Sequence, residues 1–571
     1  MDKAEIIRAL RELSLYLEID GENPFKIRSY LKAADTLEHT QESIEELINT
    51  NKLRELEGIG EAIEKKIISL YKGEPVPALE KMRNKYPESL LSLFSIPFLG
   101  GKRIKVLFEH LNIKTIEELK NACLEGKIAN LPGFNKKIEN KILKGVELIS
   151  KWEGFHLIDK GYEIANEIVN KIVGISNIDE VYIVGSVRRF TETINNVDIM
   201  VVTQDKSEVI KKIEKELDIT TSQKSDSNSV EFIYKNIKLN IHFSEPHNKY
   251  TKLFYYTGSK DFVEKYKFAL KRKGFEVDKE FNIFHHKNRI EVLSENAIFE
   301  LLNEPYLPPE VREILYEEDI LKKRIDRLIK EGEIKGIVHC HSNYSDGHNT
   351  IEELAEYCKD NGYEYLVVCD HSQSAGYAKG LNIDTVRKQH DEIENLNIKL
   401  KPFKIFKGIE CDIRLDGTLD YPNDILTTFD IVVVSVHSKL EMDENIATQR
   451  ITCAINNPFT HILGHPSGRL LLTRAGYPLN YEKIFDECLK NNVAIEINAQ
   501  PQRLDLDWKN VYKGMCRGLK FVITTDAHDI PDMRYLSYGV SIARKGLLTP
   551  EDVLNTYPAE EFINWFKKKK R

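Results

Sequence analysis

The most constraining feature of this sequence is a set of histidines and carboxylates at the ends of short apolar runs between residues 337 and 529. The runs EYLVVCDH, FDIVVVSVH and LKFVITTDAH all end in this way. Helical stretches such as TIEELAEYCKDNGY and YEKIFDECLKNN separate the runs, and this alternation predicts a parallel, barrel-like sheet. The C-terminal strand ends of such a barrel form the active site. The residues concerned are His339, His341, Asp346, His371, Glu410, His437, His465, Asp526 and His528.

The chemistry of this set favours a polynuclear metal site. A single histidine is more often a core or surface residue than a ligand, but repetition at successive strand ends changes that expectation. Imidazole nitrogens with carboxylate oxygens suit Zn²⁺, Mn²⁺ or Fe²⁺, whereas oxygens alone would suit Mg²⁺ or Ca²⁺. Ions bridged by a carboxylate lower the pKa of a water molecule and hold the leaving oxygen of a phosphate. The sequence therefore predicts phosphoester hydrolysis.

Residues 333–571 resemble the PHP (polymerase and histidinol phosphatase) domain, a trinuclear phosphoesterase barrel. The resemblance implies up to three ions, Mn²⁺ or Zn²⁺, and a catalytic part for Glu410, His437 and Asp526. Ile337 stands where the family often has Asp, at a position that is not an expected ligand. The implied ligands are His339, His341, Glu410 and Asp526 for one ion, the bridging Glu410 with His437 and His465 for a second, and Asp346, His371 and His528 for a third.

Length and composition limit the remaining possibilities. At about 150 residues per domain, 571 residues predict three to five domains. No apolar run reaches the roughly 20 residues that span a bilayer, and the N-terminus has no signal-peptide plan. We therefore expect a soluble, cytoplasmic monomer with no membrane partner. The cysteines lack paired spacing and are interpreted as small buried residues rather than disulfides, among them Cys340, Cys358, Cys369, Cys411 and Cys453.

Charge and glycine turns single out the amino-terminal region. The net charge of −8 argues against a uniformly basic nucleic-acid binder, yet residues 51–150 hold 18 Lys and Arg against 13 Asp and Glu. Three turns there, at 56–60, 96–102 and 131–135, contain glycine, and each precedes a basic helix. Glycine lets a tight turn bring backbone N–H groups and a helix N-terminus up to a phosphate, and lysines add charge without reading bases.

The three turns resemble helix-hairpin-helix motifs. The resemblance implies that they bind a DNA backbone without sequence preference. Phe98 and Asn135 replace the usual glycines, so we expect those two turns to bind more weakly. The implied DNA-binding residues are Gly58, Gly60, Lys65, Lys102 and Gly133.

Residues 23–30, with the Gly58 turn, resemble the small N-terminal domain of family X DNA polymerases. In relatives that remove deoxyribose phosphate, a lysine after this turn forms a Schiff base, and Lys66 stands at the matching position. An amine can act in this way when burial or a neighbouring charge lowers its pKa. The alternative interpretation is that Lys66 only contacts phosphate.

Residues 181–203, VYIVGSVRRFTETINNVDIMVVT, resemble the nucleotidyltransferase signature of the same family, in which a turn between a strand and a helix holds a triphosphate. The resemblance covers essentially the whole chain and includes the order of the domains. It implies that nucleotide or DNA is bound by Gly185, Ser186, Arg188, Arg189, Gly258 and Ser259.

The polymerase site departs from the family pattern. Polymerisation requires three carboxylates that hold two Mg²⁺ ions about 3.5–4 Å apart. The matching positions are Asn196, Asp198 and Asn240, so Asp198 is the one anionic metal ligand left. Phe262 and Val263 also replace a polar pair that relatives commonly carry. We expect Mg²⁺ binding and DNA synthesis to be weak or absent at a palm kept for binding DNA.

The expected fold class is multidomain α and α/β, with helical helix-hairpin-helix domains, a nucleotidyltransferase palm and thumb, and a C-terminal PHP (βα) barrel. The expected domains are a lyase-like helical domain (1–81), a fingers-like helix-hairpin-helix domain (82–150), the palm (151–244), the thumb (245–315), a linker helix (316–332) and the barrel (333–571).

The leading hypothesis for function is a DNA repair enzyme that hydrolyses phosphodiesters at DNA 3′ ends as a metal-dependent 3′→5′ exonuclease. Its expected partner is gapped or 3′-ended DNA of any sequence. One alternative is a polymerase that still fills gaps with dNTPs through Asp198. The others are a small-molecule phosphatase of the histidinol-phosphatase type and a DNA-end-binding scaffold. The DNA-binding turns favour a polymeric substrate, and nine intact ligand positions disfavour the scaffold.

Overall fold

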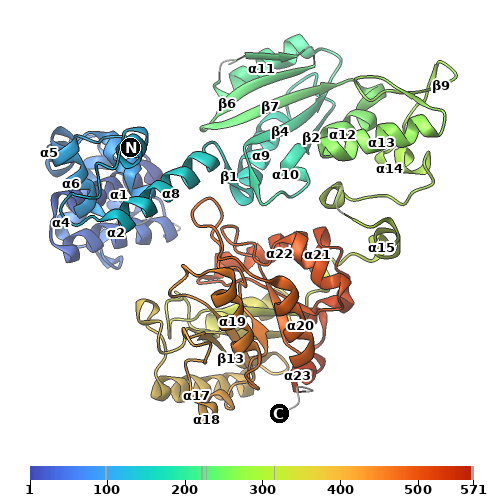
Figure 1. Cartoon of the computed structure of the whole chain (residues 1–571). Helices are drawn as coiled ribbons and strands as arrows, with labels where there is room; N and C mark the ends of the chain where they lie inside the picture. The colour runs from blue at the N-terminus through green and yellow to red at the C-terminus, as the bar shows by residue number, and fades with distance from the viewer. Residues whose placement is uncertain (41, 97–98, 220–222, 227, 314–315, 568–571) are drawn as a thin grey trace. The chain divides into compact units, whose positions relative to one another are not determined.

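The computed structural model describes residues 1–40, 42–96, 99–219, 223–226, 228–313 and 316–567. The chain forms two compact units, Met1–Glu153 and Gly154–Arg571. Figure 1 shows the first as a bundle of helices and the second as sheets with helices packed on them. Phe98 lies outside the described residues. No helix in the described part of the chain combines the length and apolar composition needed to cross a membrane.

The first unit is helical throughout its described residues. Its opening helix begins at a capping box formed by Asp2 and Glu5 and ends at Gly21, whose φ of 83° suits glycine. Ile6, Leu10 and Leu13 recur at helical spacing and are buried in the core of the unit. The helices are α1 (Lys3–Asp20), α2 (Pro24–His39), α3 (Ile44–Asn49), α4 (Glu61–Tyr71), α5 (Pro77–Lys85), α6 (Gly101–Leu111), α7 (Ile116–Leu124) and α8 (Lys136–Trp152).

The second unit begins with a mixed five-stranded sheet in the order β2-β4-β7-β6-β5. Its central strands β4 and β7 run parallel, and Asp198 on β4 lies directly opposite Asn240 on β7. This register brings together two of the three positions that the polymerase resemblance singled out. The elements are α9 (Ile158–Ile172), β2 (Glu180–Val184), α10 (Gly185–Arg188), β4 (Asn196–Val202), α11 (Lys206–Leu217), β5 (Gln223–Asp226), β6 (Ser229–Tyr234) and β7 (Ile237–Ser244).

A small helical and β region follows the palm sheet. A buried aromatic cluster holds it together, with the Phe254 ring 4.9 Å from Phe281 and 5.5 Å from Phe299 between centroids. Its elements are α12 (Lys249–Thr257), α13 (Lys260–Arg272), β8 (Glu276–Val277), β9 (Ile283–His285), β10 (Asn288–Arg289) and α14 (Glu295–Glu300).

The rest of the unit is a seven-stranded parallel barrel with strands in sequence order. Its strands are β11 (Gly336–Cys340), β12 (Tyr365–Val368), β13 (Lys404–Asp412), β14 (Ile431–Ser435), β15 (Ile462–Leu463), β16 (Ala494–Asn498) and β17 (Phe521–Thr524). Helices α16 (Ile351–Asp360), α17 (Ile383–Lys399), α19 (Glu444–Ile455), α20 (Tyr481–Asn491), α21 (Trp508–Cys516), α22 (Leu536–Lys545) and α23 (Ala559–Lys567) lie along it.

Backbone contacts bring the first and last strands of the barrel together. Thr525 donates its N–H to the carbonyl of Val338 at 3.3 Å, and His341 donates to that of Ala527 at 2.8 Å. The predicted fold class is therefore confirmed, including the nearly closed parallel barrel. Because the strands run parallel, their C-terminal ends meet at one rim.

The segment that leads into the barrel differs from the prediction of a helix over 316–332. Helix α15 covers only Glu318–Arg324 and is followed by a short 3-10 turn, Ile325–Arg327. The chain then docks on the barrel, where Ile329 donates its N–H to the carbonyl of Leu548 at 3.0 Å. This tertiary hydrogen bond replaces the helical one. The cysteines are all free, as expected, but Cys453 and Cys516 are exposed, so the prediction that Cys453 is buried was wrong.

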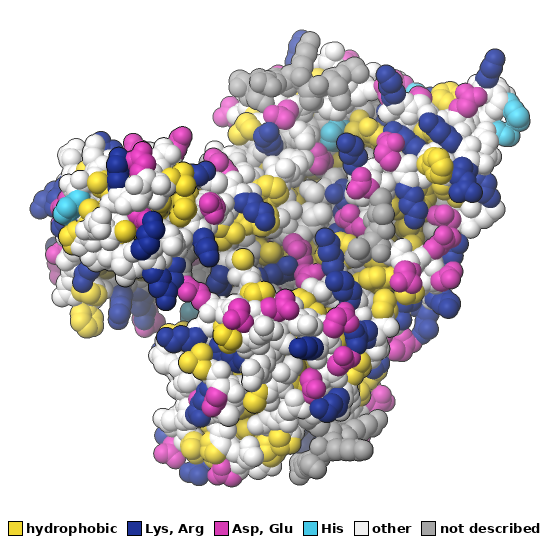
Figure 2. All heavy atoms as spheres, in the orientation of Figure 1, with side chains coloured by type: hydrophobic (Ala, Val, Ile, Leu, Met, Phe, Trp, Pro, Cys, Tyr) yellow, Lys and Arg dark blue, Asp and Glu magenta, His cyan; other side chains and the backbone are white. Residues whose placement is uncertain are grey.

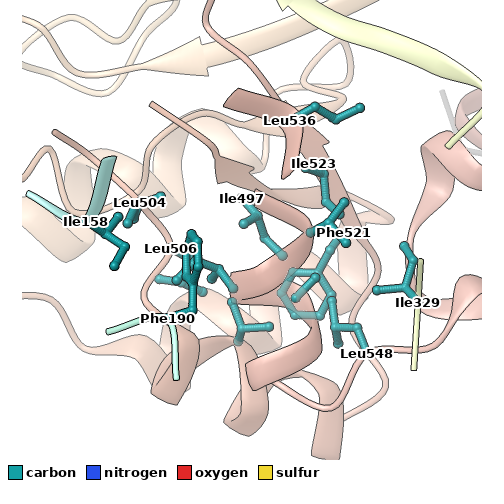
Figure 3. Packing of buried hydrophobic residues seen from close by; sticks show 14 of the residues in the cluster. Ile158, Phe190, Ile329, Ile497, Leu504, Leu506, Phe521, Ile523, Leu536 and Leu548 are labelled. Atoms are coloured by element: carbon teal, nitrogen blue, oxygen red, sulfur yellow. The ribbon is translucent and has the colours of Figure 1, made fainter. Parts of the chain in front are cut away.

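The palm and the barrel share one hydrophobic core. Figure 3 shows Ile158 and Phe190 of the palm beside Leu504 and Leu506, which lie in the loop after β16. The Tyr538 ring of α22 also lies 5.3 Å from that of Phe190. A salt bridge adds to this packing, because Arg469 of the barrel meets Glu192 of the palm at 2.8 Å. The loop after β16 therefore packs against the palm.

Candidate functional site

The strand ends of the barrel carry all nine predicted ligands to one rim. Strand β11 carries His339, the loop after it carries His341 and Asp346, and β13 carries Glu410. The other five follow the ends of β12, β14, β15 and β17. The backbone is strained at two of these positions, since His339 has φ 64° and Asp526 has φ 48°. Non-glycine residues in this region cost energy and cluster at functional sites. A register shift between Val338 and Cys340 accompanies the strain at His339.

Glu410 is the centre of the cluster. Its carboxylate lies 2.9 Å from His465 Nε2 and 3.1 Å from His437 Nε2 on one oxygen, and 3.0 Å from His371 Nδ1 on the other. His339 Nε2 follows at 3.5 Å and His341 Nε2 at 3.8 Å. A single buried carboxylate thus faces five imidazole rings. This geometry suits the bridging role that the sequence predicted.

Ligand atoms gather in three groups within the cluster. Each group offers atoms that lie within 4.8 Å of one another. The groups overlap at His341 and His371, whereas the predicted ligand sets shared only Glu410. The groups are His341, Asp346, His371 and His528; His339, His341 and Asp526; and His371, Glu410 and His437.

The donor set fits metal ions. Several buried ligand atoms have no hydrogen-bond partner in the part of the chain that the structure describes. They are His339 Nε2, His341 Nδ1 and His465 Nδ1, while His371 Nδ1 and Glu410 Oε2 lie 3.0 Å apart without the alignment of a hydrogen bond. Orphaned polar atoms at full burial are costly unless a ligand satisfies them. Nitrogen donors with carboxylates suit Zn²⁺, Mn²⁺ or Fe²⁺. The side chains of Asp346 and His528 keep 32% and 34% exposure, so the cluster opens to solvent on their side.

Carboxylates behind the ligands orient them, and sequence reasoning missed these residues as functional. His339 donates from Nδ1 to Glu496 at 2.5 Å, which leaves Nε2 facing Glu410. His437 donates from Nδ1 to Asp412 at 2.5 Å in the same way. Such partners fix the tautomer and the ring orientation of a ligand. The available signal was a carboxylate inside an apolar strand for Glu496, and the Glu-x-Asp spacing on one strand face for Asp412.

The pKa values in the cluster reflect competition between burial and charge. Burial opposes the protonation of His437, but Glu410 and Asp412 outweigh it and raise its pKa to about 10. Burial and the neighbouring His528 and His371 lower the pKa of His341 to about 3. Burial opposes the ionisation of Asp346, yet His528 lowers its pKa to about 2. Divalent cations would therefore displace protons from rings such as His437.

The palm pocket has about 580 Å³ and is lined by Gly185, Ser186, Arg189, Gly258 and Lys260, among others. Gly185 has φ 65°, and a Cβ there would lie 2.1 Å from a carboxylate oxygen of Asp198, so only glycine fits. Two further residues predicted to bind nucleotide have structural partners. Arg188 pairs with Glu295 at 2.6 Å, and the Ser259 hydroxyl caps α13 by accepting from the N–H of Phe262.

Asp198 is fully paired within its own sheet. One oxygen accepts hydrogen bonds from Asn240 Nδ2 at 2.9 Å and His242 Nε2 at 3.1 Å, and the other accepts from Asn196 Nδ2 at 2.6 Å. Burial raises the pKa of Asp198, but these hydrogen bonds hold it below its ordinary value. The carboxylate is satisfied by protein donors at both oxygens.

The three glycine turns of the first unit differ in what meets their helices. Helix α4 begins at Gly60, which has no side chain to cap it, and the preceding Gly58 has φ 84°. At α6 the N–H of Gly101 donates to the Glu18 carboxylate at 2.8 Å, so a carboxylate of the same unit already meets this helix N-terminus. At α8 the side chain of Asn135 accepts from Ile138 at 2.9 Å.

Two lysines lie near the start of α4. Lys65 pairs with Glu61 at 2.8 Å, while Lys66 donates to the Ala62 carbonyl at 2.9 Å and lies over the Tyr30 ring. Both line a pocket of about 570 Å³. Lys102 is exposed at the first turn of α6, and Gly133 has φ 80°. Figure 2 shows Lys and Arg side chains interspersed with acidic ones over the visible face of this unit.

Comparison with protein families places four models along the chain. A helix-hairpin-helix domain matches residues 1–74, and a SAM-like helix-hairpin-helix tandem matches residues 90–147. The DNA polymerase beta thumb matches residues 252–313, and the PHP domain matches residues 338–500.

Known proteins resemble the chain over its whole length or over part of it. DNA polymerase/3'-5' exonuclease PolX of Bacillus subtilis (strain 168) is 34% identical over 572 residues, which cover 100% of both chains. A probable phosphatase of Thermoanaerobacter sp. (strain X514) is 28% identical over 245 residues, or 41% of this chain and 94% of the phosphatase. A probable phosphatase of Caldicellulosiruptor bescii is 25% identical over 244 residues, or 40% of this chain and 94% of the phosphatase.

Proposed function

Because this chain belongs to the family X DNA polymerases that carry a C-terminal PHP domain, we propose that it removes nucleotides from DNA 3′ ends by phosphodiester hydrolysis at the barrel rim. The observation that carries the proposal is the Glu410 carboxylate, which five imidazole rings face within 3.8 Å. The nine ligand positions are retained, whereas two of the three palm positions are asparagines.

The residues of the cluster have different roles in the proposed hydrolysis. Bound Mn²⁺ or Zn²⁺ would supply Lewis acidity and lower the pKa of a water molecule. Glu410 would be a ligand of these ions, while Glu496 and Asp412 fix the rings of His339 and His437. Asp346 and His528 stand at the open side, where a phosphodiester enters. Arg503 lies 3.3 Å from Asp526 and adds a positive charge next to the cluster.

DNA binding by the first unit is the second part of the proposal. The α4 turn, with Lys65 and Lys66 beside it, is the strongest candidate because its helix starts at glycine and its lysines line a pocket. The α6 and α8 turns are weaker candidates, since Glu18 and Asn135 already accept hydrogen bonds from those helix ends.

The test of DNA binding by the first unit compares two turns. Replacing Lys65 and Lys66 with Gln should weaken binding to all DNA sequences alike and reduce the salt slope by about 1 for each lost phosphate contact. Lys102→Gln, next to the turn that Glu18 fills, is the matched control and should change binding less. Equal losses in both variants, measured by salt titration of fluorescence anisotropy, would remove the distinction between the turns.

The test of the activity offers three substrates to one preparation of the full chain. These are 3′-labelled single-stranded DNA, gapped duplex with dNTPs, and histidinol phosphate, each with Mn²⁺, Mg²⁺ or Zn²⁺. We expect shortening of the single strand from its 3′ end and little reaction with the other two. Rapid histidinol phosphate hydrolysis with stable DNA would favour the phosphatase alternative. Gap filling without degradation would favour the polymerase alternative.

A further inference from the structure

An exposed aromatic side chain stands at the edge of the metal cluster. Tyr377 is 71% exposed, more than most large apolar residues of the barrel. Its ring centroid lies 5.9 Å from that of His371 and 6.4 Å from that of His437, at interplanar angles of 61° and 65°. The ring thus leans on two predicted ligands and presents the rest of its surface to solvent. Single exposed aromatic residues are common, so the argument depends on how this one is held.

The loop that carries Tyr377 is fixed at several points. Leu381 donates its N–H to the His371 carbonyl at 2.8 Å, which closes the loop at its base. Ser374 donates from its hydroxyl to Asp412 at 2.8 Å and from its N–H to Asp420 at 2.7 Å. Ala375 and Ala378, on either side of the tyrosine, are buried. The exposed ring is therefore presented by an ordered loop.

Charged groups of the cluster and its surroundings lie close to Tyr377. The carboxylates of Glu410, Asp412 and Asp346 and the guanidinium of Arg503 all act electrostatically on the tyrosine hydroxyl. These groups belong to the cluster or touch it, so the ring lies beside the place where a phosphodiester reacts. A nucleotide whose phosphate lies on the cluster presents its base at the same rim.

We propose that Tyr377 is the stacking platform for the nucleobase of the 3′-terminal nucleotide in single-stranded DNA. Every base has a π-face, so stacking on an aromatic side chain tolerates any sequence. A fixed ring loses little conformational freedom when it binds. The inference rests on the proposed nuclease function and adds a base subsite to it. A phosphatase for small phosphomonoesters would have no use for this subsite.

The first experiment measures base stacking without cleavage. An oligonucleotide with 2-aminopurine at its 3′ end is mixed with the full chain in EDTA, and the fluorescence is read. Stacking should quench the probe with the unchanged protein and with Tyr377→Phe, which keeps the ring, but not with Tyr377→Leu. A probe placed several nucleotides from the 3′ end should respond equally to all three proteins. Quenching that survives in Tyr377→Leu would overturn the proposal.

The second experiment separates the base from the reacting phosphate. Loss of one stacked base should lower kcat/KM for 3′-labelled single-stranded DNA by roughly 5- to 100-fold in Tyr377→Leu, mainly through KM. With an oligonucleotide whose 3′-terminal nucleotide is abasic, kcat/KM of the unchanged protein should fall by the same factor. The kcat/KM of Tyr377→Leu should be the same on this oligonucleotide as on ordinary DNA.

The outcomes distinguish the subsite from the nuclease. If Tyr377→Leu loses as much on DNA with an abasic 3′ end as on DNA with a 3′-terminal base, Tyr377 supports the cluster rather than a base. A loss in Tyr377→Phe as large as in Tyr377→Leu would assign the role to the hydroxyl and overturn stacking. Ring-dependent quenching in EDTA together with no DNA hydrolysis under any metal would contradict the proposed function but support the base subsite.

Discussion

Glu410 and Asp198, two carboxylates of the second unit, both lie among nitrogen atoms, but the hydrogen bonding of those nitrogen atoms differs. Glu410 in the barrel faces imidazole rings, and atoms such as His339 Nε2 have no hydrogen-bond partner within the described residues. Asp198 in the palm accepts hydrogen bonds from Asn196, Asn240 and His242. An amide N–H can only donate to an anion, and the ring of His242 is engaged at both nitrogens, by Asp198 and by the Ser229 hydroxyl at 2.9 Å, whereas free ring nitrogens in the barrel can bind a cation. The neighbours of a buried carboxylate, more than its own charge, decide whether it can hold a metal.

The largest expected effect tests this comparison with one chemical change at both places. Glu410→Gln should lower the rate of DNA hydrolysis by roughly 100-fold or more, because it removes the charge at the centre of the cluster. Asp198→Asn is the matched control and should leave that rate unchanged. The rates are measured on 3′-labelled single-stranded DNA. Comparable losses in both variants would break the comparison.

A residue behind the ligands should have the next largest effect. Glu496→Gln removes the acceptor that orients His339, and we expect metal affinity to fall by about 10- to 100-fold. Isothermal titration with Mn²⁺ measures the affinity directly. Saturating Mn²⁺ should then restore most of the nuclease rate, whereas it should not rescue Glu410→Gln. Unchanged affinity would mean that His339 keeps its orientation without Glu496.

A gain of function tests the palm. Asn196→Asp with Asn240→Asp restores two anionic groups beside Asp198, and we expect gap filling with dNTPs to rise by roughly 10-fold or more. The assay uses a Glu410→Gln background so that degradation cannot mask extension. Strong Mg²⁺-dependent extension before the two changes would refute the prediction of a degenerate palm.

Failure of that double change would direct attention to the turn after Gly258. Phe262 and Val263 are buried there, and a Cβ at Gly258 would lie 2.8 Å and 2.9 Å from their side chains. These apolar contacts stand where relatives commonly carry a polar pair. A third substitution at this turn would then be needed before nucleotide could bind productively.

The smallest expected effect concerns the link between the two regions. Glu192→Gln removes the palm partner of Arg469, whose side chain also donates to the Arg503 carbonyl at 2.8 Å. We expect a loss of about 1–2 kcal/mol in the free energy of unfolding, measured by urea denaturation. Glu163→Gln is the matched control in an exposed pair with Lys160 and should cost well under about 1 kcal/mol. Equal costs would mean that the Glu192 pair does not join palm and barrel.

Sequence patterns predicted the fold class and which side chains gather at the barrel rim, because both depend on local features. Apolar runs that end in histidine or carboxylate identify strands and their ends, and parallel strands bring those ends to one rim. The family resemblance, rather than a strand pattern, grouped Asn196, Asp198 and Asn240, and the parallel register of β4 and β7 sets Asp198 opposite Asn240. The overlap between the three groups of candidate ligand atoms was not predictable in this way, because distances across the rim bring His341 and His371 each into two groups.

The sequence by itself determined which residue types are present at each strand end, and so the chemistry that each region can support. Tertiary structure alone decided the partners. His339 meets Glu496 across 157 residues, Glu18 meets the start of α6, and Arg188 turns to Glu295. Each of these contacts depends on the order and closure of strands or on the packing of helices, which set distances in space. Spacing along the chain does not give those distances, and a hydrogen bond forms only where donor and acceptor lie about 3 Å apart.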